Sequence, residues 1–378
     1  MFSFLKNFFD ELYQFRKFLK LNEEQKKVIF YAENENQLDF FEDTINSLLK
    51  RNIPITYITS SPTDKKLKFK EKINFFYIAS KSIRTIFFST LNTKVLIMSL
   101  PDLNKYEIRR SKYPVKYIFV PHNILSTHMV FRKGAFDAFD IFFCSGPHHL
   151  KEIKETENIY NLKKKTLIKF GCSRIDKIIK NFKNTKKKKK NIRVLIAPSW
   201  RTNGLFETGA EKLINHLKKK YIITLRPHPD TLRLNKNCIE NLLNKFKDNK
   251  NISYNPKIES IQNYFDNDIL ISDWSGAAFE FAFGTLKPVI FLDLPRKINN
   301  PDYLKFKNKP IEINLRNQIG RVINSKSYNK IPELINDFIK KRNFWKKKIL
   351  SIRNKQIYNI KNSGKIGADC IQNLLQKN

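Results

Sequence analysis

From Lys26 onward, the first half of the chain alternates short apolar runs with polar stretches of helical periodicity. The apolar runs are rich in β-branched and aromatic residues, which is typical of parallel strands buried on both faces. Each run is followed by a turn and a predicted helix. The pattern predicts an α/β domain with the strands KKVIFYAE, IPITYITS, INFFYIAS, TKVLIMS, VKYIFVPHN, DIFFCSG and TLIKFG.

A second series begins at Ile192, with the predicted strands IRVLIAPS, YIITLRPHP, NISYNP, DILISD and PVIFLD. We therefore expect an α/β protein of two Rossmann-like domains facing a cleft, with ligands at the carboxyl ends of the strands. The domains are placed at residues 1–182 and 192–345, and a helical tail over 346–378 is expected to pack back across them. Residues 183–191 contain a lysine run and are interpreted as a solvated linker, in preference to an anion-binding tail.

The first 20 residues place apolar side chains at helical spacings, with charged residues between them. The apolar positions are Phe4, Leu5, Phe8, Phe9, Leu12, Phe15 and Leu19. An amphipathic helix packed on the domain or on a partner is the favoured interpretation, and a helix lying on a membrane surface is the alternative. Charges at Lys6, Asp10 and Glu11 interrupt the apolar stretch, so a cleaved signal peptide is not expected.

The amino-acid composition supports a folded protein and adds the question of an anionic partner. Of 378 residues, 72 are Lys or Arg and 35 are Asp or Glu, which gives a formal net charge of +37, and the 41% hydrophobic content excludes global disorder. The charge suits an anionic partner such as a membrane surface, a nucleic acid or a phosphorylated substrate. Because Lys, Asn, Ile and Phe are abundant throughout, the charge is compatible with such a partner but does not identify one. No helix-turn-helix, zinc-finger or RNP signature is present, so a specific nucleic-acid partner is not expected.

The four cysteines, Cys144, Cys172, Cys238 and Cys370, are far apart and form no CxxC pair. Structural disulfides and a zinc cluster are therefore not expected, and a reducing cytosol fits this pattern. The longest apolar runs are far shorter than the about 20 residues that a helix needs to span a bilayer. Neither a metal site nor a transmembrane helix is predicted.

The strongest candidate site is DILISDWSGAAFEFAFGTLKPVIFLD, residues 268–293, in which a strand ends in small polar residues before a helix. Ser272, Ser275 and Gly276 would meet at the helix N-terminus, where unpaired N–H groups and the helix dipole stabilise a phosphate. Glu280, on the second turn, could reach a ribose hydroxyl pair. The alternative, of equal weight, is that Ser275 only caps the helix and Glu280 is solvated.

A second candidate is ITLRPHPDT, in which a strand runs into Arg226, Pro227, His228 and Pro229. The two prolines are expected to fix the backbone around His228 and to prevent a helix from following the strand. A histidine at a strand tip can donate to a phosphate oxygen or protonate a leaving group, and Arg226 can neutralise negative charge. A structural histidine bonded to backbone is the less favoured alternative.

His122 follows another predicted strand, in VKYIFVPHNILSTHM, and is the preferred catalytic candidate of the first domain. Ser126 and His128 lie four and six residues further on. A helix beginning directly after His122 would place Ser126 at its mouth, while His128 would point elsewhere. His148 and His149 follow the next strand and are interpreted as helix caps in preference to ligands.

Arg201, in LIAPSWRTNG, also follows a predicted strand. It could reach a diphosphate at the same edge of the second sheet, with Trp200 packed beneath it. A packed tryptophan beside a surface arginine is an equally good interpretation, and both stay open.

Taken in order, HNILSTHM, FGCSRIDKI, APSWR, RPHPD, SDWSGAAFEFA and KPVIFLD resemble the CDP-glycerol glycerophosphotransferase family, which includes teichoic-acid-type polyol-phosphate primases and polymerases. The resemblance covers residues 115–303. It implies a glycosyltransferase-B-like fold with an N-terminal acceptor-side domain and a C-terminal domain that binds a CDP-linked donor without metal or other cofactor. It also implies transfer of glycerol phosphate to a hydroxyl of a lipid- or glycan-linked acceptor, with release of CMP, in cell-envelope synthesis.

By this resemblance, the two catalytic histidines of the family fall on His122 and His228. The phosphate motif and the acidic position after it fall on Ser272, Asp273, Trp274, Ser275 and Glu280. His122 would deprotonate the acceptor hydroxyl for attack on the β-phosphorus of the donor. Arg226, His228 and the helix N-terminus at Ser275 would stabilise the developing charge.

One position departs from the family pattern. His122 stands in a Pro-His-Asn context where the polymerases have Trp-His-Gly-Thr-Pro, so the acceptor and the donor polyol stay open. A sugar-nucleotide-dependent glycosyltransferase of the same fold is the main alternative, and a non-enzymatic nucleic-acid-binding protein is the weaker one. Because no signal peptide or membrane-spanning segment is predicted, we expect a cytoplasmic protein. The basic surface and the first helix would suit the anionic inner face of the cell membrane, where a lipid-linked acceptor resides.

Overall fold

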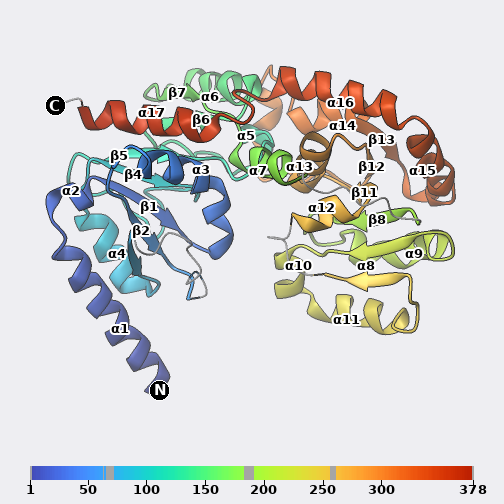
Figure 1. The fold of residues 1–378 in the computed structure, drawn as a ribbon, viewed down its shortest axis with the longest axis horizontal. Coiled ribbons are helices and arrows are strands. Elements are labelled where there is room, and N and C mark those ends of the chain that lie inside the picture. The colour runs from blue at the N-terminus through green and yellow to red at the C-terminus, as the bar shows by residue number, and fades with distance from the viewer. Residues whose placement is uncertain (1, 63, 65–71, 183–190, 256–260, 377–378) are drawn as a thin grey trace. The chain divides into compact units, whose positions relative to one another are not determined.

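The computed structural model describes residues 2–62, 64, 72–182, 191–255 and 261–376. Its contacts divide into two compact units, which are shown in Figure 1 and described separately here. The N-terminal unit comprises Met1–His122, Phe131–Arg174 and Ile357–Asn378, and the C-terminal unit comprises Asn123–Val130 and Ile175–Gln356. The chain therefore passes between the units four times, although the sequence pattern indicates a single linker. That predicted linker, 183–191, lies outside the described residues apart from Asn191.

The N-terminal unit is built on a seven-stranded parallel sheet with the order β3-β2-β1-β4-β5-β6-β7. Its strands are Val28–Ala32 (β1), Thr56–Thr59 (β2), Asn74–Tyr77 (β3), Val95–Met98 (β4), Lys116–Phe119 (β5), Ile141–Cys144 (β6) and Thr166–Lys169 (β7). All seven strands predicted from the apolar runs are present. Because β1 lies between β2 and β4, strand order reverses there, as in doubly wound folds.

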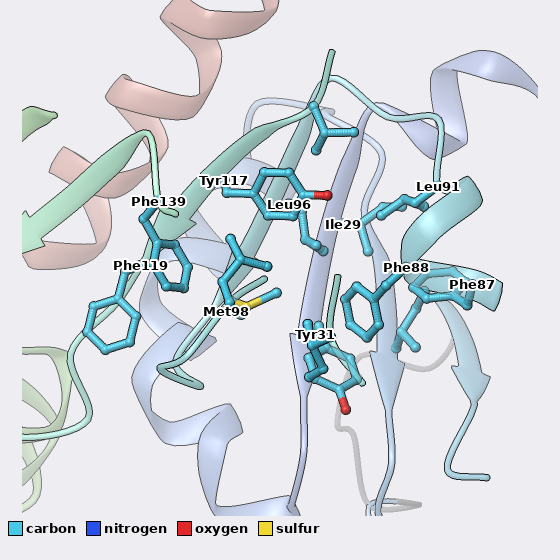
Figure 2. Packing of buried hydrophobic residues seen from close by; sticks show 14 of the residues in the cluster. Ile29, Tyr31, Phe87, Phe88, Leu91, Leu96, Met98, Tyr117, Phe119 and Phe139 are labelled. Carbon is cyan, nitrogen blue, oxygen red and sulfur yellow. The ribbon is translucent and has the colours of Figure 1, made fainter. Parts of the chain in front are cut away.

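Successive side chains of each strand point to opposite faces of the sheet. Helices pack on both of these faces. On one face, α4 (Lys81–Thr90) contributes Phe87 and Phe88, as Figure 2 shows. The ring of Phe88 meets that of Tyr31 edge-on, with centroids 4.8 Å apart. On the other face, α3 (Leu38–Leu49) and α17 (Ser363–Gln376) pack over Phe30 and its neighbours. The central strands β1 and β4 are buried at every position and contain no charged residue, whereas the edge strand β7 is partly exposed and ends in Lys169.

The first helix, α1 (Phe2–Leu19), packs on the N-terminal unit along one side. Phe18 is buried against Phe76 and Phe87. The carboxylate of Glu11 accepts hydrogen bonds from the backbone N–H groups of Ala79 and Ser80, at 3.0 and 2.6 Å, and so caps the start of α4. Among the described helices, none combines the length and apolar content needed to cross a bilayer.

The C-terminal unit has a six-stranded parallel sheet with the order β10-β9-β8-β11-β12-β13. Its strands are Arg193–Ile196 (β8), Ile222–Leu225 (β9), Ile252–Tyr254 (β10), Ile269–Ser272 (β11), Val289–Leu292 (β12) and Gly320–Ile323 (β13). The first five were predicted. The short strand β13 was missed, because it follows a helix without a turn and contains a charged residue in a half-exposed edge position. The two sheets confirm the expected α/β class with parallel, Rossmann-like order.

Helices surround the strands of the C-terminal unit, as Figure 1 shows. They are α5 (Thr127–Val130), α7 (Ser173–Phe182), α8 (Leu205–Thr208), α9 (Ala210–Leu217), α10 (Pro229–Leu234), α11 (Lys236–Lys245), α12 (Gln262–Asp266), α13 (Gly276–Thr285), α14 (Ile311–Ile319), α15 (Ile331–Lys340) and α16 (Arg342–Gln356). Helix α7 begins with two residues of the N-terminal unit. The sequence-based boundaries assign 123–130 and 175–182 to the first domain, whereas their contacts lie in the C-terminal unit.

One of the predicted local conformations is wrong. The prolines around His228 were expected to prevent a helix, but Pro229 is the first residue of α10 and His228 is its N-cap. Proline is tolerated at the first helical position because no intrahelical acceptor exists there for its missing N–H. The second proline therefore starts a helix and does not block one.

The contact between α17 and α3 predicts a large effect of adding one methyl group. A Cβ on Gly364 would lie 2.5 Å from the backbone carbonyl group of Asp43, so Gly364→Ala should destabilise the N-terminal unit by about 1–3 kcal/mol. Hydrogen exchange of the α3 and α17 amides measures this loss. Gly209→Ala is the control, because the nearest atom to its new Cβ would be 3.5 Å away. Equal protection of α17 in both variants would contradict the close packing.

Candidate active site

The C-terminal sheet has its switch point between β8 and β11, where strand order reverses and where ligands bind in such sheets. Ser199, after β8, and Asp273, after β11, join the two strand ends. The backbone N–H and the hydroxyl of Ser199 donate to the two carboxylate oxygens of Asp273, at 2.7 and 2.8 Å. Burial raises the pKa of Asp273, and the hydrogen bonds from Ser199 and from the backbone of Trp274 oppose this shift.

Two predicted phosphate ligands are therefore structural residues. Asp273 is fully buried and already accepts hydrogen bonds on both carboxylate oxygens. Ser272 is equally buried, and its hydroxyl donates to the carbonyl of Ala197 at 2.7 Å. Both residues were predicted to bind phosphate, and in the structure their side chains turn inward from the strand end. Ser199, which makes Asp273 tolerable in the interior, was not singled out from the sequence.

Ser275 and Gly276 form the start of α13, which follows β11 in Figure 1. The Ser275 hydroxyl accepts from the backbone N–H of Ala277 at 3.3 Å, so it does cap this helix. Ser275 and Gly276 are both half-buried. A Cβ on Gly276 would lie 3.2 Å from that of Asn123, so the glycine also allows close packing within this unit.

Arg226 and Glu280 are linked by Tyr264, a residue without a distinctive sequence signal. The Tyr264 hydroxyl donates to the Glu280 carboxylate at 2.9 Å and accepts from Nη2 of Arg226 at 3.0 Å. The Arg226 guanidinium also lies over the Tyr264 ring, 4.6 Å from its centroid. Arg226 is only 3% exposed, and within the described part of the chain its Nη1 has no hydrogen-bond partner. A buried cationic donor without an acceptor favours an anionic ligand.

His228 is half-buried at the carboxyl end of β9, and its position fixes its tautomer. Nδ1 accepts from the backbone N–H of Asp230 at 3.2 Å, so the proton of the neutral ring lies on Nε2. The Asp230 carboxylate is 3.7 Å from the same Nδ1. His228 therefore caps α10 through Nδ1, which is the backbone contact of the less favoured interpretation, and a phosphate contact of this residue stays a prediction.

Arg201, which was predicted to reach a diphosphate, is half-buried and contacts main-chain carbonyls. Its guanidinium donates to the carbonyl of Pro295, in the loop after β12, and to that of Thr202. The same loop brings Lys297 to the ring of Trp200, with the ammonium 5.0 Å from the ring centroid. Lys297, five residues after the end of β12, was not singled out from the sequence.

In the N-terminal unit, His122 follows β5 by two residues, Val120 and Pro121. It is half-buried, and its ring lies between two aromatic side chains. The centroids of Phe40 and Phe131 are 6.1 and 5.6 Å from that of His122. The aromatic contacts restrict the imidazole to a strand-end position, as the sequence predicted.

Ser126 and His128, the acceptor-side candidates, are buried within the C-terminal unit. The backbone N–H and hydroxyl of Ser126 donate to the carboxylate of Glu312, at 3.1 and 2.6 Å. The ring of His128 packs on that of Phe306, with centroids 4.5 Å apart. Both predicted acceptor-side residues thus make internal contacts in this unit, and the helix here begins only at Thr127. No local sequence pattern indicated that Glu312 would be buried.

His148 and His149, which follow β6, were interpreted as helix caps. His149 is buried in α6 (Pro147–Ile159), and its Nδ1 accepts from the backbone N–H of Ser145 at 3.2 Å. Ser145 precedes Gly146, the N-cap residue of α6, and in the described part of the chain no side chain caps this helix, so the contact is not the cap that was expected. Among the described residues, no group of three His, Cys, Asp or Glu side chains is arranged to hold a metal ion.

Comparison with protein families identifies a relationship over most of the chain. The model of the family described as CDP-Glycerol:Poly(glycerophosphate) glycerophosphotransferase matches residues 14–296. This match extends well beyond the motifs, into the first 114 residues, where none was recognised. No curated protein sequence matches.

Solved structures share the fold. A structure of the wall teichoic acid polymerase TagF with CDPG has a TM-score of 0.60 and 12% identity, and the match covers 93% of this chain and 89% of that one. A UDP-GlcNAc 2-epimerase from Methanocaldococcus jannaschii, in complex with UDP-GlcNAc and UDP, has a TM-score of 0.57 and 13% identity over 92% and 99% of the two chains. At these identities the likeness establishes the glycosyltransferase-B-like fold alone.

The contacts of Ser126 predict a structural phenotype. Ser126→Ala removes the hydroxyl donor from a fully buried carboxylate, so it should lower the free energy of unfolding of the C-terminal unit by about 1–3 kcal/mol. Urea denaturation followed by hydrogen exchange of α14 measures the change. The control Ser351→Ala, at an exposed position of α16, should stay within about 0.5 kcal/mol of the parent protein. An unchanged stability in Ser126→Ala would restore Ser126 as a candidate for substrate contact.

Proposed function

Because the chain belongs to the CDP-glycerol:poly(glycerophosphate) glycerophosphotransferase family, we propose that it transfers glycerol phosphate from CDP-glycerol to a hydroxyl of a glycan- or lipid-linked acceptor and releases CMP. The chain is an enzyme of this family. The acceptor, the catalytic residues and a role in cell-envelope polymer synthesis, as for the wall teichoic acid polymerase, are part of the proposal.

One observation of the C-terminal unit carries the donor side of the proposal. Arg226 and His228 follow the end of β9, and the N-terminus of α13 follows β11. All three therefore lie at the carboxyl edge of one parallel sheet. Arg226 Nη1 lacks a partner among the described residues, and His228 offers Nε2–H. Together with a capped helix N-terminus, these donors suit a diphosphate. Glu280, on the second turn of α13, is suitably charged to accept from ribose hydroxyls.

The reaction follows from these groups. The acceptor oxygen attacks the β-phosphorus, and its proton passes to His122 as general base. The bond between the β-phosphorus and the bridging oxygen breaks, and its electron pair leaves with CMP. Arg226 and the Nε2–H of His228 stabilise the charge on that leaving group, which is mainly electrostatic and positional catalysis. A sugar-nucleotide donor would use the same phosphate contacts, so the donor must be tested directly.

Removing either histidine should therefore abolish most turnover. His228→Ala and His122→Ala are each expected to lower the rate of CMP release from CDP-glycerol about 100-fold or more, given typical acid–base contributions. The assay uses purified protein, a panel of CDP-polyols and UDP or GDP sugars, and a membrane lipid extract as the source of acceptor. His216→Ala, at an exposed position of α9, is the matched control and should keep the parental rate.

The outcomes separate the alternatives. Release of CMP from a CDP-polyol, lost in both histidine variants, supports the proposal and identifies the donor. Release from a UDP or GDP sugar alone would move the enzyme to the glycosyltransferases. Full activity in folded His122→Ala and His228→Ala would refute the mechanism.

We further propose that the exposed side of α1 binds an anionic membrane surface. Phe9 and Tyr13 are 62% and 57% exposed, and Arg16 and Lys20 continue the same stripe at spacings of three and four residues. The opposite side of α1 is occupied by its own unit, so this stripe is the surface left for a partner. Aromatic residues beside basic ones are typical of helices that lie in the membrane interface.

Vesicle sedimentation tests this surface. Phe9→Ser combined with Tyr13→Ser should lower the fraction bound to phosphatidylglycerol vesicles several-fold and leave thermal stability unchanged, because both side chains project away from the core. Phe344→Ser is the control, since Phe344 is 56% exposed in the C-terminal unit. Equal binding of the double variant and the parent would reject α1 as the membrane contact.

A further inference from the structure

The loop after β12 carries a lysine that the proposed mechanism does not use. Lys297 is half-buried, and its ammonium lies 5.0 Å from the centroid of the Trp200 ring. The Trp200 ring is in turn 6.5 Å from that of His228. Lys297 and His228 are therefore both neighbours of one tryptophan at the carboxyl edge of the C-terminal sheet.

The ammonium of Lys297 has no conventional partner. Across the described residues it forms no hydrogen bond and no ion pair, and its close contact is with the face of an aromatic ring. Burial lowers the pKa of Lys297, while Asp273 and Asp230 oppose this shift at longer range. Both carboxylates have closer donors of their own, Ser199 for Asp273 and Arg233 for Asp230.

A partly desolvated ammonium with three unused donors is costly unless an anion completes its coordination. The cation–π contact holds the side chain in one place without neutralising it, because the tryptophan ring carries no net charge. Lys297 is thus positioned and still fully able to bind a negative oxygen.

We propose that Lys297 is a direct ligand of the donor diphosphate, beside Trp200 and in addition to His228 and Arg226. This inference rests on the proposed function for the identity of the donor, but its chemistry requires only a nucleoside diphosphate or its ester. Lys297 then supplies the point charge that Arg201, bonded to the Pro295 carbonyl, does not supply.

Isothermal titration of the full chain tests this role, with CDP-glycerol and inorganic diphosphate as probes. Lys297→Met should weaken the binding of both about ten- to hundredfold, the range expected when a charged hydrogen bond is lost. Lys297→Arg should recover most of the affinity, which a merely structural role would not predict. Lys305→Met, at an exposed lysine of the following 3-10 helix that pairs with Asp302, is the matched control and should bind as the parent does.

Each result has one meaning for the inference. Binding of both probes by Lys297→Met within twofold of the parent, at unchanged thermal stability, would overturn it. If the parent binds diphosphate but not CDP-glycerol, and Lys297→Met loses diphosphate binding, the inference holds and the proposed donor is wrong. If the parent binds neither probe, the inference is overturned together with the proposed donor.

Discussion

The donor edge of the C-terminal unit depends on a buried carboxylate. Asp273 lies at the end of β11 with no exposed surface, and a lone ionised carboxylate in such a place would be strongly unfavourable. Ser199 offsets this cost by donating to both oxygens from the neighbouring strand end. The pair therefore fixes the two loops that begin there, one leading to Trp200 and the other to Ser275. Without this hydrogen-bonded pair, the two loops that lead to the proposed donor-binding groups would not be fixed relative to each other.

At His228, the same hydrogen bond caps a helix and sets the tautomer of the proposed catalytic ring. The proline after it begins a helix, and the histidine accepts the N–H of Asp230 that this helix start leaves without an intrahelical partner. That single hydrogen bond determines which nitrogen carries the proton. The protonated nitrogen of the neutral ring is thus set by a backbone hydrogen bond. Tyr264 positions Arg226 in a similar way. Its hydroxyl accepts from Nη2 of Arg226, and Nη1 has no hydrogen-bond partner among the described residues.

Sequence periodicity predicted both sheets well, because strands covered on both faces must be continuously apolar. It failed at β13, a half-exposed edge strand that lacks this signature. Strand ends were also predictable, and with them the positions of His122 and His228. The direction of each side chain was not, because inward turns such as that of Asp273 depend on a partner 74 residues away in the chain. Ser126 illustrates the same limit, since the carboxylate that binds it lies 186 residues further on.

The basic residues of the donor edge are held by neutral partners. Arg226 donates to a tyrosine hydroxyl and Lys297 lies against a tryptophan ring, and neither forms an ion pair with a described residue. The nearby carboxylates of Asp273 and Glu280 instead accept from hydroxyl groups. Had the cations paired with these carboxylates, a phosphate would have had to break an ion pair before binding. Holding each cation with an uncharged group fixes its position and preserves its charge, which is what recognition of a diphosphate requires.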